Sequence, residues 1–197
     1  HQTILRIIKA TNSPIVAPSA NKYCQTSSTC AQHVETSFSD QVAVYDGGIC
    51  NVGIESTIID ATAEDKITLL RPGIISAHQI TKVAKVPCVL HENHQIKFSG
   101  SHQKHYAPQK PLILLDSLEQ LNDMPYSYVM LFNQPDNDMH HYETMPNDPT
   151  LYAKQLYQHW HHAATMSITN IIVEKPPQNT QWLGINDKLS KAAYKDD

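Results

Sequence analysis

Hydroxyl groups, flexible backbone and one guanidinium gather in three short polar segments of this sequence. They cover residues 18–28, 47–56 and 71–73, and each adjoins a short apolar run of the kind found in strands. Ligands of open α/β sheets bind outside the carboxyl ends of the strands, where free backbone N–H groups attract anions. Loops of this composition therefore suit a ligand that carries phosphate and hydroxyl groups.

Arg71 is the single residue that points most sharply to such chemistry. It stands between a strand-like run and a helix-like segment, and a guanidinium at such a junction can hold a phosphate through two hydrogen bonds. A surface ion pair is an equally good interpretation of Arg71 taken alone. Common sequence motifs do not distinguish these two interpretations. The chain has no Walker A loop, no GxGxxG motif and no GxSxG elbow.

The carboxylates and histidines have ordinary structural interpretations. Glu55 and Asp60 could bind a metal or act as a base, but strand-edge partners are the favoured interpretation. A group of histidines shares one helical face, which would suit a metal, but no cysteine or carboxylate lies nearby and a solvated face is favoured. This group comprises His159, His161 and His162, and the pair His140–His141 is interpreted in the same way.

The elements that must position these residues alternate between strand and helix. The chain opens on an amphipathic helix pattern, and a second helix is expected from about Cys30. Ser76 is the expected N-cap of a third helix, which reaches about residue 85. Short apolar or alternating runs predict strands at residues 15–17, 41–45, 56–60 and 66–70.

Residues 87–111 have neither helical nor strand periodicity and are interpreted as a linker. Tyr106 lies in this linker near a proline. A lid and a residue that anchors a packed loop are equally good interpretations of it. Beyond it the alternation resumes, which predicts a small α/β unit with a largely parallel sheet. The expected strands are 112–115, 128–132 and 171–173, and the expected helices are 149–164 and 182–194.

Composition excludes several classes of protein. A formal net charge of -4 and a pI of about 6.3 give no global attraction to nucleic acid. The four cysteines form no CxxC pair, so reduced thiols in a cytoplasm are expected rather than zinc or disulfides. No apolar run approaches the length of a membrane helix. Because the first residue is His1, we expect the chain to be part of a longer protein.

The motifs together resemble the threonylcarbamoyl-AMP synthase family, the YrdC-like proteins in their longer, two-domain form. The resemblance is carried in order by PIVAPSAN, SST, DGG, VGIESTIID, LLRPG, KHYAP and the ending IIVEKPP…LGINDKLSKAA. It implies an α/β fold: the C-terminal part of a YrdC-like domain in residues 1–88, a linker in 89–110 and a small Rossmann-like domain in 111–197.

The resemblance also implies an activity and its site. Family members combine L-threonine, bicarbonate or carbon dioxide and ATP into threonylcarbamoyl-AMP, with release of pyrophosphate and usually with Mg²⁺. The product serves threonylcarbamoyladenosine formation on tRNA, so tRNA or tRNA-modification proteins are further expected partners, and no membrane is expected. By motif position, the ATP-binding residues would be Ser19, Asn21, Ser27, Arg71 and Tyr106, with Asn21 bracing its loop, and the threonine-binding residues Ala17 and Ser56.

The sequence also departs from the family pattern. A Lys–Arg pair that holds the triphosphate is absent, and Tyr23-Cys24 replace the usual Ser-Gly. In the linker, Ser99-Gly100 and Lys104 replace the usual Pro-Gly and Arg. We therefore expect the chain by itself not to make threonylcarbamoyl-AMP. An RNA-binding module and a non-catalytic remnant are the alternatives.

Overall fold

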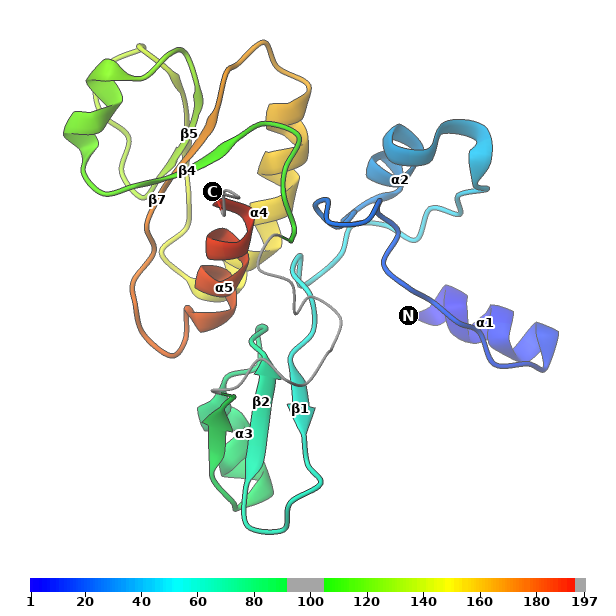
Figure 1. Ribbon diagram of the computed structural model, residues 1–197. Coiled ribbons are helices and arrows are strands. Elements are labelled where there is room, and N and C mark those ends of the chain that lie inside the picture. Colours follow the sequence, from blue (N-terminus) through cyan, green and yellow to red (C-terminus); the bar gives the residue numbers. More distant parts are fainter. Residues whose placement is uncertain (92–104, 194–197) are drawn as a thin grey trace.

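The computed structural model describes residues 1–91 and 105–193, which form three parts (Figure 1). An N-terminal segment (residues 1–50) carries helices α1 (Gln2–Thr11) and α2 (Ala31–Phe38), followed by the 3-10 turn η1 (Ser39–Gln41). A small mixed sheet occupies residues 51–91. The C-terminal unit (residues 111–193) is the best packed part, and the small sheet and the N-terminal segment extend from it.

The C-terminal unit is built on four parallel strands in the order β4-β7-β5-β6. Their bounds are β4 Leu112–Leu115, β5 Tyr128–Leu131, β6 His141–Thr144 and β7 Ile171–Glu174. Strands β4, β5 and β7 are short apolar runs with little alternation, as both faces of the sheet are covered. Tyr128 and Met130 pack beneath the helices, whereas Val129 and Leu131 pack on the opposite face with η2 (Leu118–Asp123).

Helix α4 (Pro149–Ala164) covers one face of this sheet together with α5 (Leu183–Ala193). It begins where the Asp148 side chain accepts a hydrogen bond from the backbone N–H of Leu151, with Pro149 in the first turn. The helix has a continuous buried face at helical spacing. That face consists of Tyr152, Ala153, Leu156, Tyr157, Trp160 and Ala163.

The small sheet has the order β1-β2-β3, with β1 (Ile58–Asp60) antiparallel and β3 (Cys88–Leu90) parallel to β2 (Ile67–Arg71). Helix α3 (Ala77–Ala84) connects the two parallel strands. Ser76 caps it, because its hydroxyl accepts from the Gln79 backbone while the Gln79 side chain accepts from the Ser76 backbone. The chain leaves the sheet directly after Arg71 and returns to it at Cys88.

Two expected strands in the N-terminal segment were wrong. Residues 15–17 and 41–45 have irregular backbone, and Val16 and Tyr45 are 93% and 76% exposed. A strand persists only where a neighbour pairs with its N–H and C=O groups, and no described segment pairs with these two. The apolar side chains of these two segments are therefore not built into a sheet.

The remaining elements follow the expectations with local corrections. The helices expected at 149–164 and from Cys30, and the strand expected at 66–70, are confirmed as α4, α2 and β2 to within one residue. Strand β3 lies inside the segment interpreted as a linker, and β6 was missed because His141–Thr144 is largely polar. Ser99, Gly100, Lys104 and Tyr194 lie outside the described residues. Within residues 1–91 and 105–193, no helix is long and apolar enough to cross a membrane.

Candidate functional site

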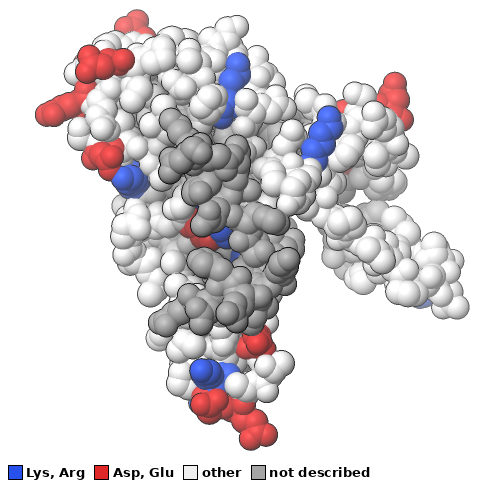
Figure 2. Space-filling view, in the orientation of Figure 1, with Lys and Arg blue, Asp and Glu red and all other residues white. Residues whose placement is uncertain are grey.

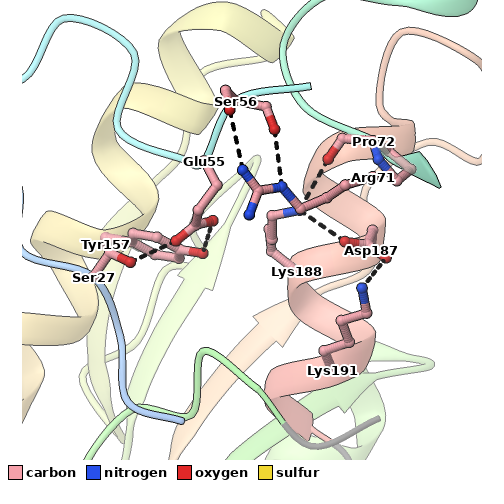
Figure 3. Close-up of polar contacts among 9 residues, drawn as sticks. All are labelled: Ser27, Glu55, Ser56, Arg71, Pro72, Tyr157, Asp187, Lys188 and Lys191. Carbon is pink, nitrogen blue, oxygen red and sulfur yellow. Dashed lines mark hydrogen bonds and ion pairs between the residues drawn. The ribbon is translucent and has the colours of Figure 1, made fainter. Parts of the chain in front are cut away.

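Three segments that are distant in the chain meet at the carboxylate of Glu55 (Figure 3). The Ser27 hydroxyl donates a hydrogen bond of 2.6 Å to Oε1, and the Tyr157 hydroxyl donates one of 2.9 Å to Oε2. A carboxylate that accepts from a hydroxyl on each oxygen is held in one orientation. Glu55 therefore joins the N-terminal segment to helix α4.

Arg71 is carried into the interior by the period of its strand. Along β2 the buried residues are Ile67, Leu69 and Arg71, so the guanidinium lies on the apolar side and is 7% exposed. Its Nε donates to the carbonyl oxygen of Ser56 at 2.9 Å and its Nη2 to the Ser56 hydroxyl at 3.1 Å. These two bonds from the planar guanidinium fix its orientation on the loop that precedes β1.

Tyr106 enters the same region from the segment before β4 and is only 1% exposed. Its carbonyl oxygen accepts from the Thr26 hydroxyl at 3.0 Å, and the next residue pairs with residues 24–26 in a short backbone ladder. The φ of Tyr106 is 63°, a left-handed conformation that is unfavourable for a bulky residue and persists only where neighbouring contacts enforce it. Burial raises the pKa of Tyr106, as does the nearby charge of Glu55, whereas the charge of Arg71 lowers it.

Lys188 supplies a fully buried cation on helix α5, with 0% of the residue exposed. Its Nζ donates to the carbonyl oxygen of Pro72 at 2.9 Å and to Asp187 Oδ2 at 2.7 Å (Figure 3). The Nζ also lies 5.0 Å from the centroid of the Tyr106 ring. Burial lowers the pKa of Lys188, while Asp187 and Glu55 oppose that shift.

Three glycines allow the backbones of this region to touch. A Cβ at Gly184 would lie 2.4 Å from the Gly73 carbonyl oxygen, and one at Gly73 would lie 2.5 Å from the Thr57 nitrogen. A Cβ at Gly53, whose φ is 88°, would lie 2.3 Å from the Ala153 carbonyl oxygen. Helix α5, the turn after Arg71 and the loop before β1 are therefore in direct backbone contact.

Comparison with known proteins identifies the family. The model described as "Threonylcarbamoyl-AMP synthase, C-terminal domain" matches residues 75–194, which is more than half of the chain. The chain belongs to the threonylcarbamoyl-AMP synthase family. A second model, described as "Telomere recombination", matches residues 1–73. The resemblance found in the motifs is thereby confirmed.

Individual threonylcarbamoyl-AMP synthases match over part of their length. The chain is 35% identical to the Pyrococcus abyssi synthase over 122 residues, which are 59% of this chain and 36% of the relative. It is 35% identical to the Bacillus subtilis synthase over 134 residues, 65% of this chain and 38% of the relative. The chain thus spans little more than a third of the curated relatives that it matches.

A solved structure from the same family shares the fold. The crystal structure of P. abyssi Sua5 complexed with L-threonine has a TM-score of 0.80 and 25% sequence identity. The match covers 98% of this chain and 62% of that one. The expected α/β fold is confirmed by this match and by the mixed and parallel sheets.

The structure brings together only some of the residues that the family resemblance assigned. Ser27, Ser56, Arg71 and Tyr106 lie in the connected region described above. Asn21 lies nearby in the chain and donates to the carbonyl oxygens of residues 22 and 25, across its own loop.

Ala17 and Ser19 are exposed and lie in irregular backbone of the N-terminal segment. Asp60 accepts from the backbone of Thr62 at the end of β1, as a strand-edge residue does.

The histidines on α4 are not a solvated face, which corrects the expectation. His159 Nδ1 is hydrogen-bonded to the Tyr128 hydroxyl at 2.7 Å. His161 stacks on His33 of α2 with ring centroids 3.8 Å apart, and its Nε2 lies 3.1 Å from the Ser27 carbonyl oxygen. Only His162 is exposed.

His140 is also buried rather than solvated. It is 5% exposed, with Nε2 bonded to the Leu121 carbonyl oxygen at 3.0 Å. No group of three or more His, Cys, Asp or Glu among the described residues is arranged to hold a metal ion.

Tyr157 and Lys188 were missed by sequence reasoning. Tyr157 belongs to an apolar helical stripe, and such a tyrosine is normally a core residue. Lys188 left a detectable signal, because it lies on the buried face of α5 with Ile185 and Leu189. A lysine on the apolar face of a helix needs buried partners, and here they are the Pro72 carbonyl oxygen and the Asp187 carboxylate.

Proposed function

We propose that this chain contributes to the synthesis of threonylcarbamoyl-AMP by binding ATP and L-threonine around Arg71. The supporting observation is the guanidinium of Arg71, buried at a strand end and held in one plane by both the backbone and the hydroxyl of Ser56. A fixed guanidinium suits a phosphate oxygen, and a hydroxyl beside it suits the polar groups of an amino acid. Membership of the synthase family supports the same reaction.

The residue roles follow the family pattern. Arg71 binds the phosphates, Tyr106 covers the nucleotide, and Ser27 contacts ATP from the same region. Ser19 and Asn21 complete the ATP contacts from the preceding loop. Ser56 and Ala17 bind threonine.

In the proposed reaction, the amine nitrogen of L-threonine first bonds to the carbon of carbon dioxide and releases a proton, or to the carbon of bicarbonate with loss of water, and either route gives a carbamate. A carbamate oxygen then attacks the α-phosphorus of ATP, and the bond from that phosphorus to the bridging oxygen breaks, so pyrophosphate leaves with the electron pair. Such a displacement requires positioning and stabilisation of negative charge, and no covalent nucleophile from the protein. Arg71 supplies charge, and the buried Tyr106 excludes water. Mg²⁺ accompanies the phosphates of ATP as a neutralising ion.

The proposed product is used in tRNA modification, so tRNA and tRNA-modification proteins are proposed partners at a later step. We place the reaction in the cytoplasm, where ATP, threonine and tRNA are available together. Among the described residues on the face drawn in Figure 2, the lysines and arginines lie apart from one another and form no continuous basic patch. That distribution favours a small-molecule site over an RNA-binding module.

Titration calorimetry with ATP tests the proposal. Arg71→Ala should weaken ATP binding at least tenfold, since a charge-assisted hydrogen bond contributes about 1.5–3 kcal/mol and tenfold equals about 1.4 kcal/mol. Arg6, the only other arginine in the chain, lies exposed on α1 and provides the matched control. Arg6→Ala should leave the affinity unchanged. Equal affinities of the Arg71→Ala variant and the unchanged chain would refute the proposed role of Arg71, and no binding by the unchanged chain would refute the site.

A further inference from the structure

We propose that Lys188, on helix α5 of the C-terminal unit, is a positioning residue that sets the Arg71 turn and Tyr106 relative to each other for nucleotide binding. The inference rests on the proposed function and extends it to a residue that touches neither substrate. The observation that supports the inference is a buried ammonium group that contacts both segments.

The first observation is that each N–H donor of the Lys188 ammonium group faces either an acceptor oxygen or an aromatic ring. An ammonium group has three N–H donors. Two are directed to the Pro72 carbonyl oxygen at 2.9 Å and the Asp187 carboxylate at 2.7 Å. The ring of Tyr106, 5.0 Å away, offers the third side of the ammonium group a negative aromatic face. One cation thus holds the residue that directly follows Arg71 and the aromatic ring that enters beside it.

The second observation is the tight contact between the helix and the turn. The contact between α5 and the turn requires a glycine, because a Cβ at Gly184 would lie 2.4 Å from the Gly73 carbonyl oxygen. Gly73 is in turn packed against the backbone of the loop that carries Ser56. The hydrogen bond from Lys188 therefore forms across a tight backbone contact between α5 and the turn. A change in the position of α5 would move the turn after Arg71 and the loop that carries Ser56.

The third observation is energetic. Burying a lysine is costly, and exchanging a buried ion pair for apolar side chains is often neutral or stabilising. Asp187 keeps Lys191 as an ion-pair partner when Lys188 is replaced, so a Lys188 that served only the packing of α5 could be exchanged for a methionine of similar length. A cation at this position has a distinct effect only on the geometry and electrostatics of the two segments that it contacts.

The central experiment compares Lys188→Met with Lys191→Met. Both lysines contact Asp187 from the same helix, Lys191 at 2.9 Å, but only Lys188 reaches the Pro72 carbonyl oxygen. Lys188→Met should weaken ATP binding at least tenfold, while Lys191→Met should stay within twofold of the unchanged chain. Unfolding by urea reports stability separately. A Lys188→Met variant that loses stability but binds ATP normally would overturn the inference.

A double-variant cycle tests whether Lys188 acts through Arg71. If it does, Lys188→Met should weaken ATP binding far less in the Arg71→Ala background than alone, because coupled residues are not additive. Hydrogen exchange gives a readout that needs no nucleotide: amides of residues 71–75 and 105–107 should exchange faster in Lys188→Met than in Lys191→Met. Unchanged exchange together with additive effects would refute the positioning role.

A steric variant keeps the test decisive if Lys188→Met does not fold. Gly184→Ala favours helix formation but places a methyl group against the Gly73 carbonyl oxygen, so it displaces α5 from the turn. It should weaken ATP binding while α5 stays helical by circular dichroism, and unchanged affinity would count against the inference. Absence of ATP binding in the unchanged chain would instead refute the proposed function itself.

Discussion

Single side chains in this protein act by joining segments that are far apart in sequence. Glu55 accepts from Ser27, 28 residues away, and from Tyr157, 102 residues away. Tyr157 is fully buried, and burial together with the charge of Glu55 raises the pKa of its hydroxyl well above the ordinary value, so it stays protonated as a donor. At Glu55 the candidate site is thus held by hydroxyl donors on a carboxylate, whereas Lys188 forms an ion pair with Asp187.

At the residue scale we predict that Tyr157→Phe destabilises the chain. The variant leaves one oxygen of the Glu55 carboxylate without its donor, which should lower the free energy of unfolding by about 1.5–3 kcal/mol. Tyr152→Phe is the matched control, because Tyr152 is on the same buried helix face and its hydroxyl has no hydrogen-bond partner among residues 1–91 and 105–193. The control should change stability by less than about 0.5 kcal/mol. Urea unfolding measures both, and equal losses would contradict the prediction.

Helices and strands determine which of these side chains meet. The period of β2 turns Arg71 inward, and the buried face of α4 presents Tyr157 to Glu55. The same helix carries His161 against His33 of α2. His33 Nδ1 accepts from the backbone N–H of Thr29 at 3.2 Å, a bond that requires the neutral ring. Helix α2 is thus attached to the C-terminal unit partly through two uncharged imidazoles.

At the element scale we predict that acid weakens this attachment. Burial, with a smaller effect of His161, lowers the pKa of His33 from 6.5 to about 4. Above pH 6.5 the ring is neutral in both the folded and unfolded chains, so its stabilising contribution is complete. Between pH 6.5 and 4 the unfolded chain binds the proton first, so this contribution is lost as the pH falls.

Replacing His33 with Gln removes this titration. The stability difference between the unchanged chain and His33→Gln, measured by urea unfolding, should therefore shrink from pH 7 to pH 4. Carboxylates that titrate in the same window are common to both proteins and cancel in the comparison. A difference that stays constant across this range would contradict the prediction.

The whole molecule is unevenly packed, with a dense C-terminal unit and an extended N-terminal segment. Large apolar side chains of that segment are exposed, among them Leu5, Ile15, Val16, Val42 and Tyr45. Ala17 and Ser19 lie on it, in exposed, irregular backbone. In the described part of the chain, the buried cations of the connected region are Arg71 and Lys188, and Lys188 is engaged with Pro72 and Asp187.

At this scale we predict that the 197-residue chain binds ATP without turning it over. The single guanidinium of the proposed phosphate site gives little stabilisation to a triphosphate and to the charge that develops as pyrophosphate leaves. The measurement is pyrophosphate release with ATP, L-threonine and bicarbonate, compared with the same mixture lacking threonine. Threonine-dependent release by this chain would sink the prediction.

The sequence alone determined the features that depend on neighbouring residues. The caps and apolar stripe of α4 and the capping box of α3 are set by contacts within a few residues, so local patterns predict them. The motif order also identified the family. Tertiary structure decided the rest, because it depends on partners far along the chain. Residues 15–17 and 41–45 have strand patterns but find no strand to pair with, and Glu55, Tyr157 and Lys188 gain their roles only when α4 and α5 pack against the loops around Ser56 and Arg71.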